Sequence, residues 1–252
     1  MTARPVVLEV DGVGKTFRKT TVLKAASFRA TAGEVTTLMG RNGSGKTTLF
    51  RIAIGRVRPD FGRVVYRGEL LTRPTLAHLA RTGLIYCPQT GALSSLYTVR
   101  QHLSAVADTF GGTERLEVVI GKLGLEEYLD RRPYQISTGE RQRAVLGMVL
   151  VRRPECLIMD EPFAGVEPKD RPLIAGGIRE LREAGAAIVI SGHDVEDIFE
   201  VSDKVIWVTA GTTHWMGSPG TAAAHDQFRR EYLGPLRLLS QAARIRDGSD
   251  GA

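Results

Sequence analysis

The sequence predicts an α/β fold whose core is a mostly parallel sheet, with an N-terminal antiparallel β subdomain and an inserted helical subdomain. Short apolar runs that end abruptly in polar residues recur between residues 35 and 208, as buried parallel strands do. Residues 6–39 show the alternating hydropathy of antiparallel strands. Residues 99–129 repeat apolar side chains at helical spacing, which predicts the helices of the insert.

The composition is that of an ordinary globular protein. The chain has 252 residues, 42% hydrophobic and 25% charged, with a formal net charge of +6. A basic balance suits nucleic acid or an anionic membrane surface, but aromatic residues make up only 6% and no Lys/Arg block is interleaved with them. No nucleic acid partner is therefore expected. Because the apolar runs are far shorter than the ~18 residues of a membrane span and no leader is visible, we expect a cytoplasmic chain.

The N-terminal part is expected to contain three short strands. They are placed at residues 6–10, 21–23 and 26–30, before a turn at 32–34. Phe17 precedes the second of them. On its own, Phe17 is explained as a core residue, but the glycine-rich motif downstream makes it a candidate for stacking on a base ring.

Residues 40–47, Gly-Arg-Asn-Gly-Ser-Gly-Lys-Thr, fit the phosphate-binding loop pattern between a strand-like and a helix-like run. The glycines let successive backbone N–H groups turn inward around an anion, and the following helix adds the positive end of its dipole. Lys46 is expected to reach the β- and γ-phosphates and Thr47 to ligate Mg²⁺. A plain glycine-rich turn between core elements is the alternative.

Further strands are expected at residues 62–68, 84–87, 156–159, 186–190 and 204–208. Cys87 and Cys156 lie inside two of these runs without metal-ligand spacing, so both are interpreted as buried hydrophobes. Just past the ends of four predicted parallel strands stand Gly40, Gln89, the pair Asp160 and Glu161, and His193. Because ligands bind at the carboxyl edge of open α/β sheets, one fold would gather these groups around one phosphate chain.

Two of these features have simpler explanations of their own. Adjacent carboxylates such as Asp160 and Glu161 are costly when buried and unpaired, and bound Mg²⁺ compensates for them. Without a phosphate loop, a solvated turn would explain the pair. A lone histidine such as His193 is usually structural, so its functional interpretation depends on the other motifs.

Ser137 and Glu140 form the pattern of a capping box ahead of a helical run at 141–151, which Pro154 ends. Such a helix presents free N–H groups at its N-terminus. Capping alone explains the pair, and a second phosphate site is the alternative.

Together the motifs resemble the nucleotide-binding subunit of an ATP-binding cassette (ABC) transporter, over residues 6–234. The resemblance implies a P-loop NTPase (RecA-like) fold in one ABC ATPase domain, 1–234, with its core at 1–88 and 151–234, a helical subdomain at about 90–150, and a C-terminal tail at 235–252. It makes 40–48 the Walker A loop, 137–140 the signature loop, 160–161 the end of the Walker B strand and 164–167 the D-loop.

The resemblance also implies individual roles and two cofactors, ATP and Mg²⁺. The implied catalytic residues are Glu161, which orients or deprotonates the attacking water, and His193, Gln89 and Lys46. The residues implied to bind ATP are Phe17, Gly40, Asn42, Gly43, Ser44, Gly45, Lys46, Thr47, Thr48, Ser137 and Gly139. The residues implied to hold the metal are Thr47, Gln89 and Asp160.

Two loops depart from the family pattern. The signature, usually Leu-Ser-Gly-Gly-Gln, reads Ile-Ser-Thr-Gly-Glu at 136–140, so Thr138 adds a branched side chain beside the expected γ-phosphate while Glu140 preserves the cap. Glu167 stands where the D-loop commonly has Asp. Residues 160–166 and 229–234 are similar to the cassettes of lipopolysaccharide export and branched-chain amino-acid import.

The function that this resemblance implies is an ATPase that works as a dimer beneath a membrane. Each ATP would lie between the Lys46 loop of one subunit and the Ser137 helix of a second, identical or different subunit. The chain would bind transmembrane permease subunits at the inner face of the membrane. Because those subunits would select the cargo, this sequence does not indicate the substrate or the direction of transport. Residues 235–246 are expected to form a short basic amphipathic helix and 247–252 a frayed end.

Two other functions remain open at this point. A soluble cassette ATPase without a transporter is one. The sequence lacks the second cassette typical of translation factors and the coiled coils or zinc spacings of repair proteins, so iron-sulfur assembly is the form of this alternative that stays open. The other is a nucleotide-binding regulatory module with impaired hydrolysis, which Thr138 and Glu167 suggest. Glu161 and His193, both retained, favour active hydrolysis.

Overall fold

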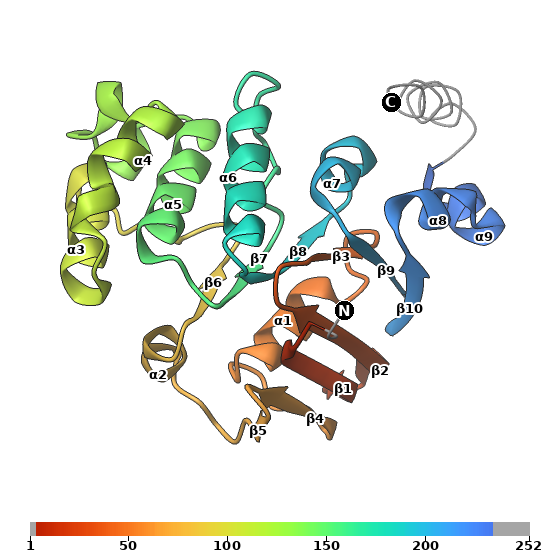
Figure 1. Cartoon of the computed structure of the whole chain (residues 1–252). Helices are drawn as coiled ribbons and strands as arrows, with labels where there is room; N and C mark the ends of the chain where they lie inside the picture. The colour runs from red at the N-terminus through yellow and green to blue at the C-terminus, as the bar shows by residue number, and fades with distance from the viewer. Residues whose placement is uncertain (1–3, 234–252) are drawn as a thin grey trace.

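The computed structural model describes residues 4–233, without the side chains of residues 232 and 233. In this part of the chain ten strands form one curled mixed sheet, in the order β5-β4-β1-β2-β10-β9-β3-β8-β7-β6 (Figure 1). The predicted α/β class is confirmed. The helix predicted at 235–246 and the end at 247–252 lie outside the described residues.

The strands are β1 (Val6–Phe17), β2 (Thr20–Thr31), β3 (Val35–Met39), β4 (Phe61–Tyr66), β5 (Glu69–Leu70), β6 (Leu84–Cys87), β7 (Cys156–Met159), β8 (Ala187–Gly192), β9 (Lys204–Thr209) and β10 (Thr212–Gly217). The α-helices are α1 (Lys46–Ala53), α2 (Leu76–Arg81), α3 (Val99–Phe110), α4 (Leu116–Leu123), α5 (Thr138–Arg152), α6 (Arg171–Glu183), α7 (Val195–Val201), α8 (Pro219–Ala224) and α9 (Asp226–Phe228). Shorter helical turns are η1 (Thr113–Arg115), η2 (Glu126–Tyr128), η3 (Pro133–Gln135) and the π-helical η4 (Arg229–Leu233).

The neighbouring strands β9, β3, β8, β7 and β6 run parallel. Their register brings their carboxyl ends to one edge of the sheet: Met39 pairs with Gly192, and Cys87 pairs with Met159. All residues of β3, β7 and β8 are buried, because helices cover both faces of this part of the sheet. The polar residues that follow these strands therefore lie at the same edge of the sheet.

The N-terminal part of the sheet differs from the expectation of three short strands. The runs at 6–10, 21–23 and 26–30 belong to two continuous strands, β1 and β2, which pair antiparallel. Register shifts after Val10 and Val13 let β1 keep its pairing through the glycine-containing stretch 11–14, which lies outside the predicted strands. Phe17 is consequently the last residue of β1.

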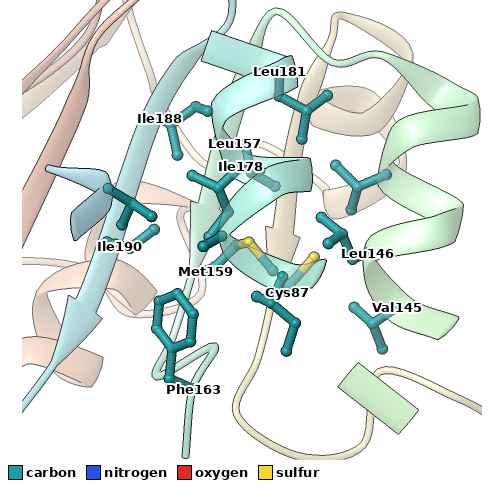
Figure 2. Packing of buried hydrophobic residues seen from close by; sticks show 14 of the residues in the cluster. Cys87, Val145, Leu146, Leu157, Met159, Phe163, Ile178, Leu181, Ile188 and Ile190 are labelled. Atoms are coloured by element: carbon teal, nitrogen blue, oxygen red, sulfur yellow. The ribbon is translucent and has the colours of Figure 1, made fainter. Parts of the chain in front are cut away.

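Figure 1 shows α3, α4 and α5 grouped at one end of the molecule and β1, β2, β4 and β5 at the other. The helical group is inserted between β6 and β7. Figure 2 shows how α5 and α6 pack onto the parallel strands: Leu146 and Ile178 face Leu157, Met159 and Ile188 in one buried cluster. Both cysteines are buried and free, as predicted. Among residues 4–233 we find no helix with the length and apolarity that crossing a membrane requires.

Candidate functional site

The glycine-rich loop turns directly from β3 into α1. The helix begins at Lys46 with Gly45 as its N-cap, at φ 106° and without a capping side chain. A Cβ at Gly45 would come 2.7 Å from Leu23 Cδ2, so only glycine fits here. The hydroxyl of Ser44 is buried and has no hydrogen-bond partner within residues 4–233. An acceptor inside the loop would satisfy it, which fits a bound phosphate.

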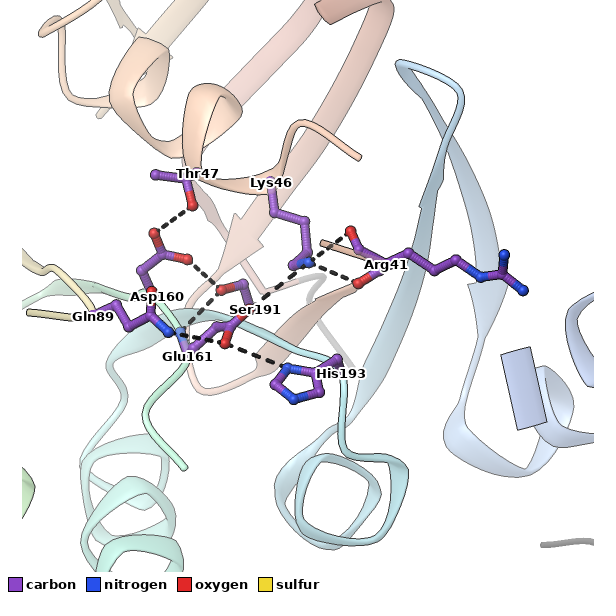
Figure 3. A network of polar contacts seen from close by, with 9 residues as sticks. Arg41, Lys46, Thr47, Gln89, Asp160, Glu161, Ser191 and His193 are labelled. Carbon is purple, nitrogen blue, oxygen red and sulfur yellow. Dashed lines mark hydrogen bonds and ion pairs between the residues drawn. The ribbon is translucent and has the colours of Figure 1, made fainter. Parts of the chain in front are cut away.

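Lys46 lies under the loop rather than in solvent. Its Nζ donates hydrogen bonds of 2.7 Å to Gly40 O and 3.3 Å to Arg41 O, and lies 3.9 Å from Glu161 Oε1 (Figure 3). Burial lowers the pKa of Lys46, and the nearby carboxylates of Glu161 and Asp160 oppose this shift. The ammonium is thus held at the mouth of the loop by acceptors that a phosphate oxygen could replace.

Asp160 follows β7 and is held by two hydroxyl groups from other elements. Thr47 Oγ1 donates to its Oδ2 at 2.8 Å, and Ser191 Oγ donates to its Oδ1 at 2.6 Å. The carboxylate is 4% exposed, so these bonds fix its orientation. Thr47 and Asp160 together offer two oxygen atoms beside the phosphate loop, the ligand type that Mg²⁺ prefers.

Glu161 is held in a conformation that is unusual for its residue type. Its φ is 52°, in the left-handed region, and its N–H donates to Ser191 Oγ at 3.0 Å. Its Oε2 accepts a 3.2 Å hydrogen bond from Gln89 Nε2 and lies 3.3 Å from His193 Nδ1. The strained backbone turns this carboxylate towards a cavity of about 240 Å³, which Gln89, His193 and Asn42 also line.

These groups suit a polyphosphate with a divalent ion. The loop could supply N–H groups and Lys46 to phosphate oxygens, and Thr47 and Asp160 could supply oxygen ligands to a metal ion. Within the described residues no group of three or more His, Cys, Asp or Glu side chains could hold a metal alone. A divalent ion here would therefore be completed by phosphate oxygens and water, as is usual for Mg²⁺.

Comparison with known proteins identifies the family. The model of the ABC transporter family matches residues 23–164, which is more than half of the chain. The chain belongs to the ABC transporter family. This confirms the resemblance inferred from the motifs.

Relatives of the ABC family cover nearly the whole chain. The lipopolysaccharide export system ATP-binding protein LptB of Acidithiobacillus ferridurans is 30% identical over 233 residues, covering 90% of this chain and 97% of that protein. The Fe(3+) ions import ATP-binding protein FbpC 2 of Rhodococcus jostii is 32% identical over 241 residues, covering 92% and 69%. One relative serves export and the other import, so the likeness carries no direction of transport.

Solved ABC structures share the fold. CbiO1 from Clostridium perfringens, described as part of the ABC transporter complex CbiONQ, has a TM-score of 0.74 and 26% identity, covering 96% of this chain and 99% of that one. A second match, an ATP-binding subunit of an ABC transporter, has a TM-score of 0.75 and 25% identity, covering 90% and 94%. The predicted P-loop NTPase fold is confirmed.

In this ABC cassette the predicted site residues fall into two groups, and Phe17 belongs to neither. Residues 40–48, Gln89, Asp160, Glu161 and His193 meet at the sheet edge described above. Phe17 lies apart at the end of β1, with its ring exposed and Lys15 Nζ 5.5 Å from the ring centroid.

The signature residues form the second group. Ser137 caps α5, and the predicted capping box is present: Ser137 N donates to Glu140 Oε2 at 2.6 Å, and Glu140 N to Ser137 Oγ at 3.2 Å. No hydrogen bond joins Ser137 or Gly139 to residues 40–48 within the described chain. The methyl group of Thr138 instead packs against Gly165, where an added Cβ would lie 3.3 Å away. The branched side chain is thus turned towards the chain's own D-loop.

Ser191 was given no role from the sequence, although its hydroxyl group is hydrogen-bonded to both Asp160 and Glu161. A polar residue at the end of a buried strand was the available signal. Sequence reasoning also missed Asp170 and Arg171 at the start of α6, which contact the signature and His193 segments. Their roles depend on which loops the fold brings to α6, so no local pattern shows them.

A second cavity, of about 530 Å³, lies between the helical group and β6. Its lining combines apolar side chains of α3 and α5, such as Phe110 and Val149, with three arginines, Arg51, Arg56 and Arg152. The guanidinium of Arg152 stacks 4.6 Å from the Phe110 ring centroid and donates to Ala80 O at 3.1 Å. This cavity is a groove with an apolar wall and a basic rim.

Proposed function

We propose that this chain is the ATP-binding and ATP-hydrolysing subunit of an ABC transporter. The observation that carries the proposal is the position of Glu161 beside the phosphate loop. Its carboxylate faces Lys46, Gln89 and His193 at the carboxyl edge of the sheet. A carboxylate so placed can orient or deprotonate the water that attacks a γ-phosphate.

The remaining groups act by positioning and charge stabilisation, which dominate phosphoryl transfer. Lys46 and His193 would share the charge of the γ-phosphate. Bound Mg²⁺ would neutralise phosphate charge and orient the oxygens. Thr47 and Asp160 would hold it, and Gln89 would contribute its amide oxygen because its amide nitrogen already contacts Glu161.

Two cassettes would meet head to tail around ATP. The support is the separation of the two groups of site residues: within the described chain Ser137 and Gly139 make no hydrogen bond to residues 40–48, while Thr138 packs against Gly165 and Gly139 lies beside Asp170. The N-terminus of α5 would then face the ATP of another molecule. Phe17, exposed at the end of β1, would stack on the adenine. Each ATP would then contact Lys46 of one subunit and Ser137 of the other.

The groove beside α3 and α5 would receive a membrane partner. Its apolar wall and basic rim fit a short helix at the end of a permease loop, and the segment after Gln89 forms one side of it. Permease subunits would hold the cassette at the inner face of the cell membrane. We infer the same division of the chain as before: an ABC ATPase domain at 1–234, with its core at 1–88 and 151–234 and a helical subdomain at about 90–150.

Other functions have less support. The relatives named above are subunits of export and import systems, which favours transport over a soluble ATPase of iron-sulfur assembly. A hydrolysis-impaired regulatory module would not need Glu161 oriented by Gln89 and Ser191, as it is here.

The test is ATP binding and phosphate release by the full-length chain, with Mg²⁺ and with EDTA. We expect Mg²⁺-dependent binding and hydrolysis by the parent and loss of most nucleotide affinity in Lys46→Ala. Lys169→Ala, an exposed lysine paired with Glu167, is the matched control. Unchanged ATP titration in Lys46→Ala, or binding without hydrolysis in the parent, would overturn the proposal.

A further inference from the structure

The first turn of α6 starts with two adjacent charged residues whose side chains contact different loops. Asp170 stands at the N-cap position of α6 and is 5% exposed. Arg171 opens the helix and lines the cavity beside Glu161 and His193. The two residues therefore connect two different loops through one turn of the chain.

Asp170 lies against the signature loop. A Cβ at Gly139 would come 2.3 Å from Asp170 Oδ2, so the carboxylate occupies the space beside this glycine. Its Oδ1 lies 3.4 Å from Arg143 Nε, one turn further along α5. Arg143 Nη1 in turn donates to Leu123 O at 2.7 Å and Gly124 O at 3.0 Å, at the end of α4. Asp170 thereby joins α6 to both the signature turn and the helical group.

The Asp170–Arg143 pair is suited to fixing geometry. Both side chains are largely buried, and Arg143 Nε has no hydrogen bond among residues 4–233. Buried ion pairs contribute little net stability because desolvation offsets their attraction. Loss of one partner, however, leaves the other charge buried and unpaired, which is destabilising. The signature turn is therefore held where Asp170 and Arg143 can meet.

Arg171 holds the loop that carries His193. Its Nη1 donates to Asp197 Oδ2 at 2.5 Å and lies 3.7 Å from Asp194 Oδ2. Its Nε donates to Val166 O at 3.1 Å, in the D-loop. Asp194 directly follows His193, so the guanidinium fixes the start of α7 relative to the D-loop. Arg171 thus acts on the side of the cavity that faces Glu161.

We propose that Asp170 and Arg171 are positioning residues for two different nucleotides. Asp170 acts through Gly139 on the ATP bound by a second copy of the chain, and Arg171 acts through His193 on the ATP bound by its own loop. This inference rests on the proposed head-to-tail dimer. It makes the first turn of α6 the place where one subunit connects its two ATP sites.

The test uses full-length heterodimers purified through two different tags, each combining two single variants. The reference is Lys46→Ala paired with Ser137→Ala, which leaves one intact ATP site when subunits meet head to tail. We expect phosphate release several-fold above either variant homodimer. If this reference pair stays inactive, the proposed dimer fails, and the inference fails with it.

If the reference pair is active, we expect the Asp170 and Arg171 variants to regain activity with different partner variants. Asp170→Asn should regain activity with Lys46→Ala, because the damage lies on the signature side. Arg171→Gln should stay inactive with Lys46→Ala but regain activity with Ser137→Ala and with Asp170→Asn. A general folding defect would lower all combinations alike.

Two further measurements keep the test decisive. Asp170→Asn should bind ATP as monomer with the affinity of the parent, and Arg143→Lys should fall into the same group as Asp170→Asn even if the latter folds poorly. Identical behaviour of Asp170 and Arg171 variants in all pairings, or parent-like hydrolysis by both homodimers, would overturn the inference.

Discussion

The Thr47 hydroxyl donates a 2.8 Å hydrogen bond to Asp160 Oδ2, joining the first turn of α1 to the end of β7 across 113 residues of sequence. The bond keeps two oxygen atoms from separate elements within reach of one ion. The proposed site for Mg²⁺ would therefore be preorganised by the fold, because the two oxygen atoms are already held together.

Asp160→Asn removes the charge that this arrangement offers to the metal. We expect the Mg²⁺-dependent gain in ATP affinity to fall roughly 10- to 150-fold, as for loss of a charged interaction of about 1.5–3 kcal/mol. ATP binding in EDTA should change little. Isothermal titration with and without Mg²⁺ measures both, with the exposed acid variant Asp108→Asn as control. An unchanged Mg²⁺ dependence would contradict the assignment of Asp160.

Glu161→Gln should separate binding from hydrolysis. The amide preserves size and can still contact Gln89 and His193, but it cannot accept a proton from water. We expect hydrolysis to fall about 100- to 10,000-fold, the usual contribution of a general base, while ATP binding persists and holds a stable dimer. Phosphate release and gel filtration with ATP measure these outcomes. The control is Glu183→Gln, an exposed carboxylate at the end of α6; hydrolysis by Glu161→Gln at the parent rate would exclude Glu161 as the base.

The edge of the sheet could be predicted from the sequence because buried parallel strands leave a distinct pattern. The runs at 156–159 and 186–190 are apolar throughout and stop at the polar residues Asp160 and Ser191, so their carboxyl ends are visible. The loop at 40–47 indicates which edge of the sheet would bind phosphate. Together these features place Gln89, Asp160 and His193 without knowledge of their contacts.

Other features depend on tertiary pairing or were not anticipated. The bulges that keep β1 continuous become favourable only when β2 and β4 pair with it. Ser191 bridges Asp160 and Glu161 because β7 and β8 are neighbours, which no local pattern reveals. Helix α6 was missed although Ile174, Ile178 and Leu181 repeat at helical spacing.

Phe17→Ala should remove only the contact with the adenine ring and leave the phosphate contacts intact. Stacking on an aromatic side chain contributes about 1–3 kcal/mol per base, so ATP affinity should fall roughly 5- to 150-fold. Affinity for inorganic tripolyphosphate should stay the same, and Phe17→Trp should retain ATP binding. Trp215→Ala, which removes another exposed aromatic ring, is the control. An equal loss for ATP and tripolyphosphate would mean that Phe17 acts on the fold rather than on the base.

The buried thiols should make the fold sensitive to alkaline pH. Burial raises the pKa of Cys87 from 9.0 to about 12, and burial also raises the pKa of Cys156, with a smaller upward contribution from Glu155. Between the ordinary thiol pKa and the raised one, the unfolded chain releases thiol protons that the folded chain keeps. The free energy of unfolding should therefore fall as pH rises from about 9 towards 12. Burial raises the pKa of Tyr66 and Tyr86 to about 12 as well, from 10.0, which acts in the same direction.

The contribution of the thiols is isolated by Cys87→Ala/Cys156→Ala, measured by urea unfolding at a series of pH values. The double variant should be less stable than the parent near neutral pH, because it loses buried sulfur atoms from the core. Its stability should nevertheless decline less steeply above pH 9, because the two thiols with raised pKa values no longer contribute to the decline. In the parent at pH 8, both thiols should resist iodoacetamide until urea unfolds the chain, since the thiolate is the reactive form. Parallel declines in parent and variant, or rapid labelling of the folded parent, would show that these thiols are neither buried nor shifted.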